Sequence, residues 1–112
     1  MEIKQSQKGG LTIFALSGKL DALNADEVEE TIGKAIDQGA TKVLVNLAGV
    51  DYISSAGLRI VLRLENKLKK QQGQFILSNL QTFVRDIFKV VGFNALFTIL
   101  DDQSEALDKH AP

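Results

Sequence analysis

The sequence predicts an α/β fold, with a mixed, largely parallel sheet of about four or five strands packed by about four helices. Segments rich in β-forming residues alternate with segments of helical periodicity, in the order β-β-α-β-α-β-α-β-α. The run Val43–Leu47 is almost continuously apolar, as in a strand covered on both faces. A helical segment separates it from the next strand, Gln74–Ser78, and such a connection requires a parallel crossover.

The first two strands are predicted to form a hairpin. Glu2–Gln7 is the expected edge strand, and Leu11–Leu16 is rich in β-forming residues. Lys8–Gly10 between them is typical of a turn. Ser17–Asp21 is expected to lead away from the second strand, with Gly18 marking a bend or a bulge.

The first helix is predicted to begin at Asn24 and to end at Gly39. Asn24 is a favourable N-cap, and Glu27 stands three residues further on, as in a capping box. Gly39 suits the position that directly follows a helix. The apolar residues of this segment fall on one helix face: Val28, Ile32, Ala35 and Ile36.

The central strand and the second helix flank a short polar loop. Thr41–Leu47 is the predicted strand, and Ala48–Asp51 is expected to lead from it to two serines. The helix is predicted over Ser55–Gln71, with Gly73 closing it. Its buried face has helical spacing: Leu58, Val61 and Leu62.

The next part of the chain is predicted to contain two strands and one helix. Gln74–Ser78 is a strand, Leu80–Val91 a helix that Gly92 stops, and Leu96–Ile99 a short final strand. Four residues of the helix are expected to face inward: Phe83, Ile87, Phe88 and Val91.

The C-terminal segment is predicted to be a short helix and a tail. Asp101-Asp102 and Glu105 favour a helix start, and the helix is expected to run through Asp108. Capping explains this acidic pair better than a weak cation site does. Lys109–Pro112 is expected to be a frayed tail, and the 112 residues a single domain.

Ser54 and Ser55 lie where the chain enters the second helix. Helix N-termini carry unpaired N–H groups and partial positive charge, so a phosphate would be well tolerated there. One interpretation is plain capping, in which either serine accepts a hydrogen bond, worth about 1 kcal/mol. Physical considerations alone favour it. Capping needs one serine, however, and the second one, with the small Ala56 and Gly57, would leave room for a phosphate or another molecule.

The segment Asp51–Arg59 resembles the signature of the STAS domain, most closely that of the stand-alone bacterial anti-sigma factor antagonists. In that family an apolar strand and a short loop precede Asp-Ser-(Ser/Thr/Ala)-Gly-Leu, which opens a helix. Alignment on Gly57-Leu58 places Ser55 at the family's phosphoacceptor, Ser54 at its Asp and Ala56 at its second hydroxyl position.

A second match supports the resemblance. Gly18-Lys19-Leu20-Asp21 is similar to the Gly-x-(Leu/Ile)-Asp that ends an early strand in the family. The likeness in the order of elements covers about the whole chain, which makes it more specific than a single motif. The resemblance therefore implies the STAS strand order.

The resemblance also implies a phosphorylation switch. Ser55 would be phosphorylated by an anti-sigma factor that is a serine kinase, and a serine phosphatase would reverse the reaction. Because a serine replaces the family's Asp, Ser54 is a rival acceptor. The unmodified protein would bind the kinase and release a sigma factor. The implied partner-binding residues are Asp21, Asn24, Ser54, Ser55, Ala56, Gly57, Leu58, Arg59 and Leu62.

Composition argues against several other functions. The net charge of −1 does not favour nucleic acid, which requires a strongly basic face. The chain has no cysteine, its one histidine is His110 near the end, and no nucleotide-binding loop occurs, so no metal, cofactor or catalytic triad is expected. The N-terminus has no apolar signal core and no run reaches membrane-spanning length, so the protein is expected to be cytoplasmic.

Two other functions are kept as alternatives. One is a STAS-type interaction module that is not phosphorylated and serves a transporter or a signalling assembly. The other, less favoured, is an enzyme with Ser55 as its nucleophile. The sequence does not decide between a monomer and a dimer.

Overall fold

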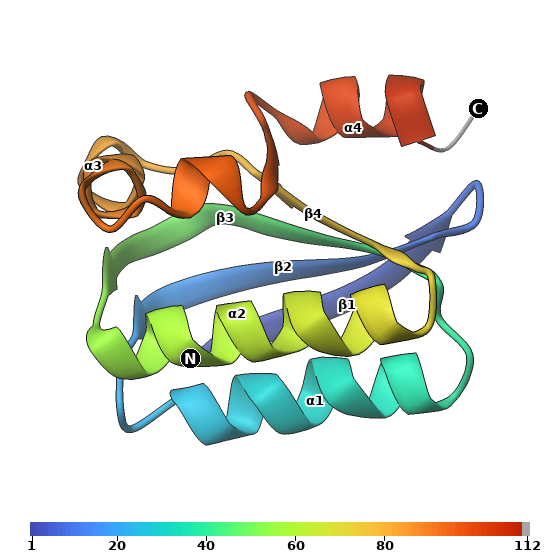
Figure 1. The fold of residues 1–112 in the computed structure, drawn as a ribbon, viewed down its shortest axis with the longest axis horizontal. Helices are drawn as coiled ribbons and strands as arrows, with labels where there is room; N and C mark the ends of the chain where they lie inside the picture. The colour runs from blue at the N-terminus through green and yellow to red at the C-terminus, as the bar shows by residue number, and fades with distance from the viewer. Residues whose placement is uncertain (111–112) are drawn as a thin grey trace.

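The computed structural model describes residues 1–110, and its centre is a five-stranded sheet in the order β1-β2-β3-β4-β5 (Figure 1). β1 and β2 are antiparallel, and all other neighbouring strands are parallel. This confirms the predicted fold class and order of elements. The strands are Glu2–Lys8 (β1), Leu11–Leu20 (β2), Lys42–Ile53 (β3), Gln74–Ser78 (β4) and Thr98–Leu100 (β5).

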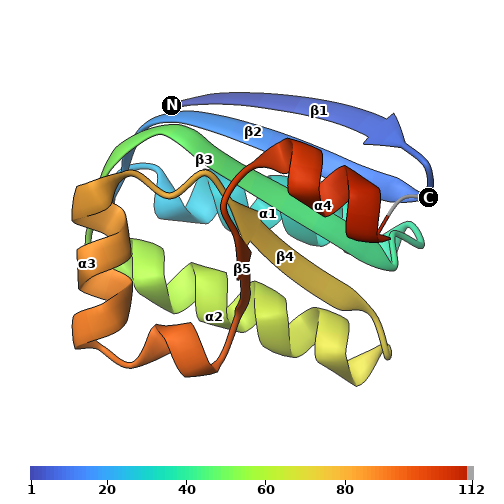
Figure 2. The same cartoon turned by 90° about the horizontal axis from the view of Figure 1, so that it is seen from above.

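The helices cover both faces of the sheet. Figure 1 shows α1 (Ala25–Asp37) and α2 (Ser55–Lys70) together beneath one face, and α4 (Gln103–His110) above the other. α3 (Thr82–Val90) lies at one end of the sheet, and a short 3₁₀ helix, η1 (Phe93–Ala95), follows it (Figure 2). No helix within residues 1–110 is both long and apolar enough to cross a membrane.

The two faces of the sheet carry separate apolar clusters, as the two-residue period of a strand requires. The larger cluster joins the sheet to α1, α2 and α3, and Phe14, Val45 and Leu77 are among its strand residues. The smaller one includes Leu44 and Ile76 and packs under Ala106 of α4. β3 and β4 are thus buried on both sides, as the nearly continuous apolar runs predicted.

The β1–β2 hairpin turns through Gly9 and Gly10, with φ angles of +56° and +82°. A two-residue loop of this type needs positive φ at both positions, which glycine adopts without steric cost. The hairpin and its turn confirm the sequence prediction. β1 extends one residue further than expected, to Lys8.

β2 and β3 are both longer than predicted. Ser17–Asp21 and Ala48–Asp51 were expected to lead away from their strands, yet Ser17–Leu20 pairs with residues 49–53. Gly49 faces Ser17 so closely that a Cβ would meet the Ser17 side chain. The register shifts between Ala15 and Ser17 and again after Gly18, which confirms the predicted irregularity. Small residues here mark a close, irregular strand pair, and the prediction of loops was wrong.

The residue with positive φ that follows the helix is a glycine after α1 but a glutamine after α2. Gly39 follows α1 with φ of +110°, as predicted. After α2 the left-handed residue is Gln72, with φ of +60°, so Gly73 does not supply the reversal expected of it. A Cβ on Gly73 would lie 2.6 Å from both the Leu68 side chain and the Thr41 carbonyl. Gly73 is therefore needed for close packing.

The buried face of α3 was predicted only in part: Phe88 is buried and Ile87 packs partly buried against the core, as expected, but Phe83 and Val91 do not face inward. Val84 and Phe88 are its buried residues, whereas Phe83 and Val91 are 48% and 46% exposed. The segment is apolar over a wide arc, so two neighbouring faces both fit helical spacing. α3 lies at the end of the sheet, where only one of these faces meets the core.

α4 confirms the predicted capping by acidic residues. The Asp102 carboxylate accepts a hydrogen bond from the Glu105 N–H at 2.8 Å, and Glu105 accepts one from the Asp101 N–H at 3.3 Å. The helix includes Lys109 and His110, which were expected to fray. The His110 carbonyl accepts a hydrogen bond from Lys42 Nζ at 3.2 Å. The remainder of the predicted tail, 111–112, lies outside the described residues.

Candidate functional site

The serine loop and the loop after β2 lie at the same edge of the sheet. β2 and β3 are parallel, so their carboxyl ends meet there. The Ser54 N–H donates a hydrogen bond to the Leu20 carbonyl at 3.0 Å, which joins the two strand ends directly. The structure thus brings together Asp21, Asn24 and the two serines, which lie far apart in the sequence.

The Asp21–Asn24 loop is held by its own polar groups. The Asp21 carboxylate accepts hydrogen bonds from the Leu23 N–H at 3.1 Å and from the Asn24 side chain at 3.4 Å. Asn24 Nδ2 also donates to the Lys19 carbonyl at 2.6 Å. Asn24 occupies the N-cap position of α1 but makes no side-chain capping bond, so the predicted capping box with Glu27 is wrong. Its amide instead ties the loop to β2.

The two serines have different environments. Ser54 is the N-cap of α2, in an extended conformation, and its Oγ accepts a hydrogen bond from the Gly57 N–H at 3.4 Å. Ser54 is half-buried, whereas Ser55 is the first residue of the helix and is exposed. Within residues 1–110 the Ser55 hydroxyl has no hydrogen-bond partner. Capping therefore engages one serine and leaves the other accessible.

Gly57 packs inside the fold and is not part of an open surface. It is buried, and a Cβ there would collide with the Leu20 carbonyl and lie 2.9 Å from the Ile53 side chain. The sequence suggested that the small residues leave room for another molecule, but β2 already fills that room. Ala56, Leu58 and Leu62 are partly buried against the core.

The electrostatic environment at the N-terminus of α2 favours an anion. Its first turn holds no acidic residue, so the partial positive charge of the helix end is not offset locally. Arg59 is exposed one turn into the helix. Arg63, one turn further along α2, is exposed, and its Nε lies 3.5 Å from a carboxylate oxygen of Glu29 in α1. Ser55 and Arg59 therefore form the exposed polar part of the candidate site.

Three exposed apolar residues near this edge were missed in the sequence. Leu23, between Asp21 and Asn24, is 91% exposed. Tyr52, two residues before Ser54, stacks on Phe83 of α3 with ring centroids 5.8 Å apart and an interplanar angle of 16°. An apolar residue in a polar loop was a usable signal for Leu23. The aromatic stack depends on tertiary structure and had no such signal.

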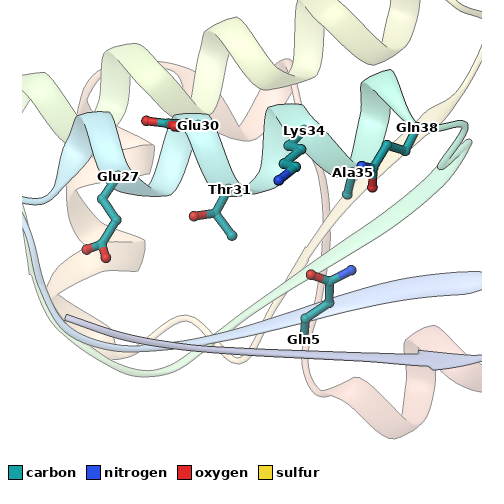
Figure 3. Close-up of a pocket in the computed structure, with 7 residues that line it drawn as sticks. All are labelled: Gln5, Glu27, Glu30, Thr31, Lys34, Ala35 and Gln38. Carbon is teal, nitrogen blue, oxygen red and sulfur yellow. The ribbon is translucent and has the colours of Figure 1, made fainter.

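Two openings beside α1 do not involve the serines. A polar cavity of about 600 Å³ lies between Gln5 of β1 and one side of α1 (Figure 3). Glu27, Glu30 and Lys34 are among its lining residues. Across residues 1–110, no three His, Asp or Glu side chains gather as metal ligands would. α4, which holds His110, ends at the opposite end of the molecule from the start of α2 (Figure 1).

Comparisons with known proteins agree with this geometry. The family model described as STAS domain matches residues 2–106. The chain is 33% identical over 106 residues to BtrV of Bordetella bronchiseptica, provisionally named an anti-sigma factor antagonist. The match covers 95% of this chain and 91% of BtrV. RsfB of Mycobacterium tuberculosis, named an anti-sigma-F factor antagonist, is 24% identical over 88% of this chain and 80% of its own.

Solved structures show the same fold. A Thermotoga maritima protein provisionally described as an anti-sigma factor antagonist superposes with a TM-score of 0.91, at 18% identity, over 96% of this chain and 92% of its own. The phosphorylated form of the Bacillus cell fate determinant SpoIIAA superposes with a TM-score of 0.76, at 24% identity. The match covers 96% of this chain and 98% of SpoIIAA. On the match across residues 2–106 and the identity to BtrV, this chain belongs to the STAS domain family.

Proposed function

We propose that this protein is an anti-sigma factor antagonist, and that its unmodified form binds an anti-sigma factor kinase. The names of BtrV and RsfB support the general function. Residues 1–112 would act as one STAS domain in the cytoplasm. Binding would remove the anti-sigma factor from its sigma factor and so permit transcription.

Phosphorylation of Ser55 would switch the protein off. The observation that carries this proposal is the division of roles between the serines: Ser54 caps α2, and Ser55 is exposed with its hydroxyl unengaged. The kinase would transfer a phosphoryl group from ATP to Ser55 Oγ, and a serine phosphatase would hydrolyse the ester. The chain itself would be the substrate in both reactions, with no catalytic role.

A phosphate on Ser55 would leave the fold intact and disrupt the interface. It adds about 1.5 to 2 negative charges near neutral pH, and the helix N-terminus favours negative charge. The same charge would lose its water inside a protein interface, and an unpaired buried charge costs about 3–5 kcal/mol. The affinity for the kinase would therefore fall without any unfolding.

The proposed interface combines both loops at this edge of the sheet. Ser55 and Arg59 would supply its polar contacts, and the Asp21–Asn24 loop would lie beside them. Leu23 is the apolar anchor, because a side chain 91% exposed at the tip of an ordered loop can be desolvated by a partner. Gly57 would contribute indirectly, by holding α2 close to Leu20.

Affinity capture from native-cell extract tests this function. The baits are the wild-type protein, Ser55→Glu and Leu23→Ser, each verified as folded by circular dichroism. We expect the wild type to retain a protein with a serine-kinase domain, identified by mass spectrometry, and both variants to retain less of it. A variant on a distant surface, Glu30→Gln, is the matched control and should behave as the wild type does. Equal capture by wild type and Ser55→Glu would contradict the proposal.

A further inference from the structure

β1 leaves one edge of the sheet without a neighbouring strand. The order β1-β2-β3-β4-β5 places β1 at one end of the sheet, and Figure 2 shows no other described element along its outer side. Of its seven residues only Ile3 is partly buried, and the others are exposed. An uncovered edge strand of this length presents a row of backbone groups with which another strand can pair. β1 is therefore a candidate docking edge.

The register of the hairpin determines which backbone groups of β1 point outward. Lys8 pairs with Leu11 across the two-residue loop, and the pair that closes such a loop is hydrogen-bonded. Hydrogen-bonded and non-hydrogen-bonded pairs alternate along an antiparallel ladder. The even-numbered residues of β1 therefore direct their N–H and C=O groups toward β2. The odd-numbered residues direct theirs outward: Ile3, Gln5 and Gln7.

An antiparallel copy of β1 matches these outward groups. A two-fold axis through Gln5, perpendicular to the sheet, makes the two strands overlap over all seven residues. Gln5 of one copy then lies opposite Gln5 of the other, and Ile3 lies opposite Gln7. Each of these pairs can exchange both of its backbone hydrogen bonds. The free edge is therefore complementary to itself.

The charges at the two ends of β1 are also complementary in this register. Glu2 of each copy lies opposite Lys8 of the other, and both side chains stand on the same face of the sheet because strand residues alternate with a period of two. These are non-hydrogen-bonded pairs, whose Cα atoms lie about 4.5 Å apart, so their side chains come close. Within residues 1–110, neither Glu2 nor Lys8 forms an ion pair. Lys4 lies opposite the uncharged Ser6 of the other copy.

Other registers with the same symmetry are less favourable. A shift of two residues in one direction places Lys4 opposite Lys4 of the other copy, and a shift in the other direction places Lys4 opposite Lys8. Like charges directly opposite one another destabilise a strand pair. Each shift also shortens the ladder. Charge and overlap together therefore select the register in which Glu2 meets Lys8.

We propose that β1 is a self-association edge, at which two copies of this chain pair through antiparallel β1 strands and join their sheets into one. The interface is isologous, so a single strand supplies both halves. Since β1 has only seven residues, the contact area is small and the dimer is weak, as expected of interfaces below about 1,200 Å². The pairing does not depend on the function proposed above.

Cysteine cross-linking of the full chain tests the geometry, because the chain has no cysteine of its own. Gln5→Cys places both thiols beside the two-fold axis, with Cα atoms about 5.5 Å apart, which a disulfide can span. Gln7→Cys is the matched control. It is also exposed, but its two copies would lie four residues apart along the ladder, about 13 Å, which is too far for a disulfide.

Non-reducing gel electrophoresis after mild oxidation measures the cross-linking. We expect a covalent dimer from Gln5→Cys and little from Gln7→Cys. Equal cross-linking of the two variants, or none in Gln5→Cys, would overturn the antiparallel pairing about Gln5.

Sedimentation velocity over a wide concentration range, at low salt, tests the pairing without a cross-link. We expect the wild type to pass from monomer to dimer as its concentration rises. Glu2→Lys alone and Lys8→Glu alone each place like charges opposite one another and should move this transition to about fivefold higher concentration. The double variant Glu2→Lys/Lys8→Glu restores opposite charges and should return the transition close to that of the wild type.

Lys89→Glu is the matched control for net charge. It lies on α3, away from β1 (Figure 2), and should leave the transition unchanged. A double variant as weak as either single one would overturn the register. A wild type that stays monomeric at every concentration would overturn the proposal and leave the β1 edge to a strand of a different protein.

Discussion

The Ser54 N–H lies 3.0 Å from the Leu20 carbonyl, so the start of α2 is fixed to the end of β2. This bond places the serine loop beside the Asp21–Asn24 loop. It also positions Gly57 against the backbone of Leu20. The candidate site is therefore a rigid edge of the sheet. Substitutions at its packed residues, Ser54 and Gly57, should change the free energy of unfolding.

Loss of the Ser54 hydroxyl should destabilise the protein without preventing phosphorylation. Ser54→Ala removes the oxygen that accepts from the Gly57 N–H, and an N-cap of this type contributes about 0.5–2 kcal/mol. Ser55→Ala, at an exposed position, should change the free energy of unfolding by less than about 0.5 kcal/mol. Urea denaturation of both variants measures the difference. Equal stability of the two would show that Ser54 is not the effective cap.

Gly57→Ala should destabilise the fold strongly for a single methyl group. The added Cβ would meet the Leu20 carbonyl, which is backbone and cannot move aside easily. Overpacking of this kind costs about 1–3 kcal/mol. Gly33→Ala is the matched control, because a Cβ added at that helical glycine would have nothing within 4 Å. It should stabilise α1 by about 0.5–1 kcal/mol, as alanine does relative to glycine in a helix.

Thermal denaturation of both glycine variants checks this pair. Opposite shifts in Tm are expected, downward for Gly57→Ala and upward for Gly33→Ala. If Gly57→Ala melts at the wild-type temperature, α2 can move away from β2, and the edge is less rigid than described above.

Glu65 should make stability depend on pH. Burial raises the pKa of its carboxyl above the usual 4.5, and Lys69 partly opposes the shift. One carboxylate oxygen is buried without a hydrogen-bond partner in the described chain. A pKa that is higher in the folded state than in the unfolded state means that the folded protein favours the protonated carboxyl. The contribution of protonated Glu65 to stability is therefore fully present below pH 4.5. That contribution is lost as the pH rises through the folded-state pKa.

Glu65→Gln removes the ionisable carboxyl and should show how much its ionisation lowers the free energy of unfolding. The variant should match the wild type below pH 4.5 and be the more stable of the two near neutral pH, about pH 7. Free energies of unfolding at both pH values measure this. A variant that is less stable than the wild type at neutral pH would mean that attraction to Lys69 outweighs desolvation.

Much of the fold could be predicted from local patterns. The alternation of strand and helix periods predicted all nine elements in order, and the β4 prediction of Gln74–Ser78 matches the structure. The errors share a physical cause. Gly18 and Gly49 resemble loop residues in the sequence, but they allow β2 and β3 to pair closely. The two possible faces of α3 could be separated only by its position at the end of the sheet.

The candidate site was predictable to a lesser degree. The sequence placed two serines at a helix start, and only the structure distinguishes Ser54 as the cap from Ser55 as the exposed residue. Gly57 could not be assigned to internal packing without knowing that Leu20 lies against it. The stack of Tyr52 on Phe83 joins residues from two distant elements, and no local pattern predicts such a contact.

Intact-mass measurement with site mapping tests the central claim most directly. The protein would be purified from its native cell under several growth conditions, alongside Ser54→Ala and Ser55→Ala. We expect one added phosphate in the wild type and in Ser54→Ala, mapped to Ser55, and none in Ser55→Ala. A phosphate that persists in Ser55→Ala, or its absence from the wild type under every condition, would contradict the proposed switch.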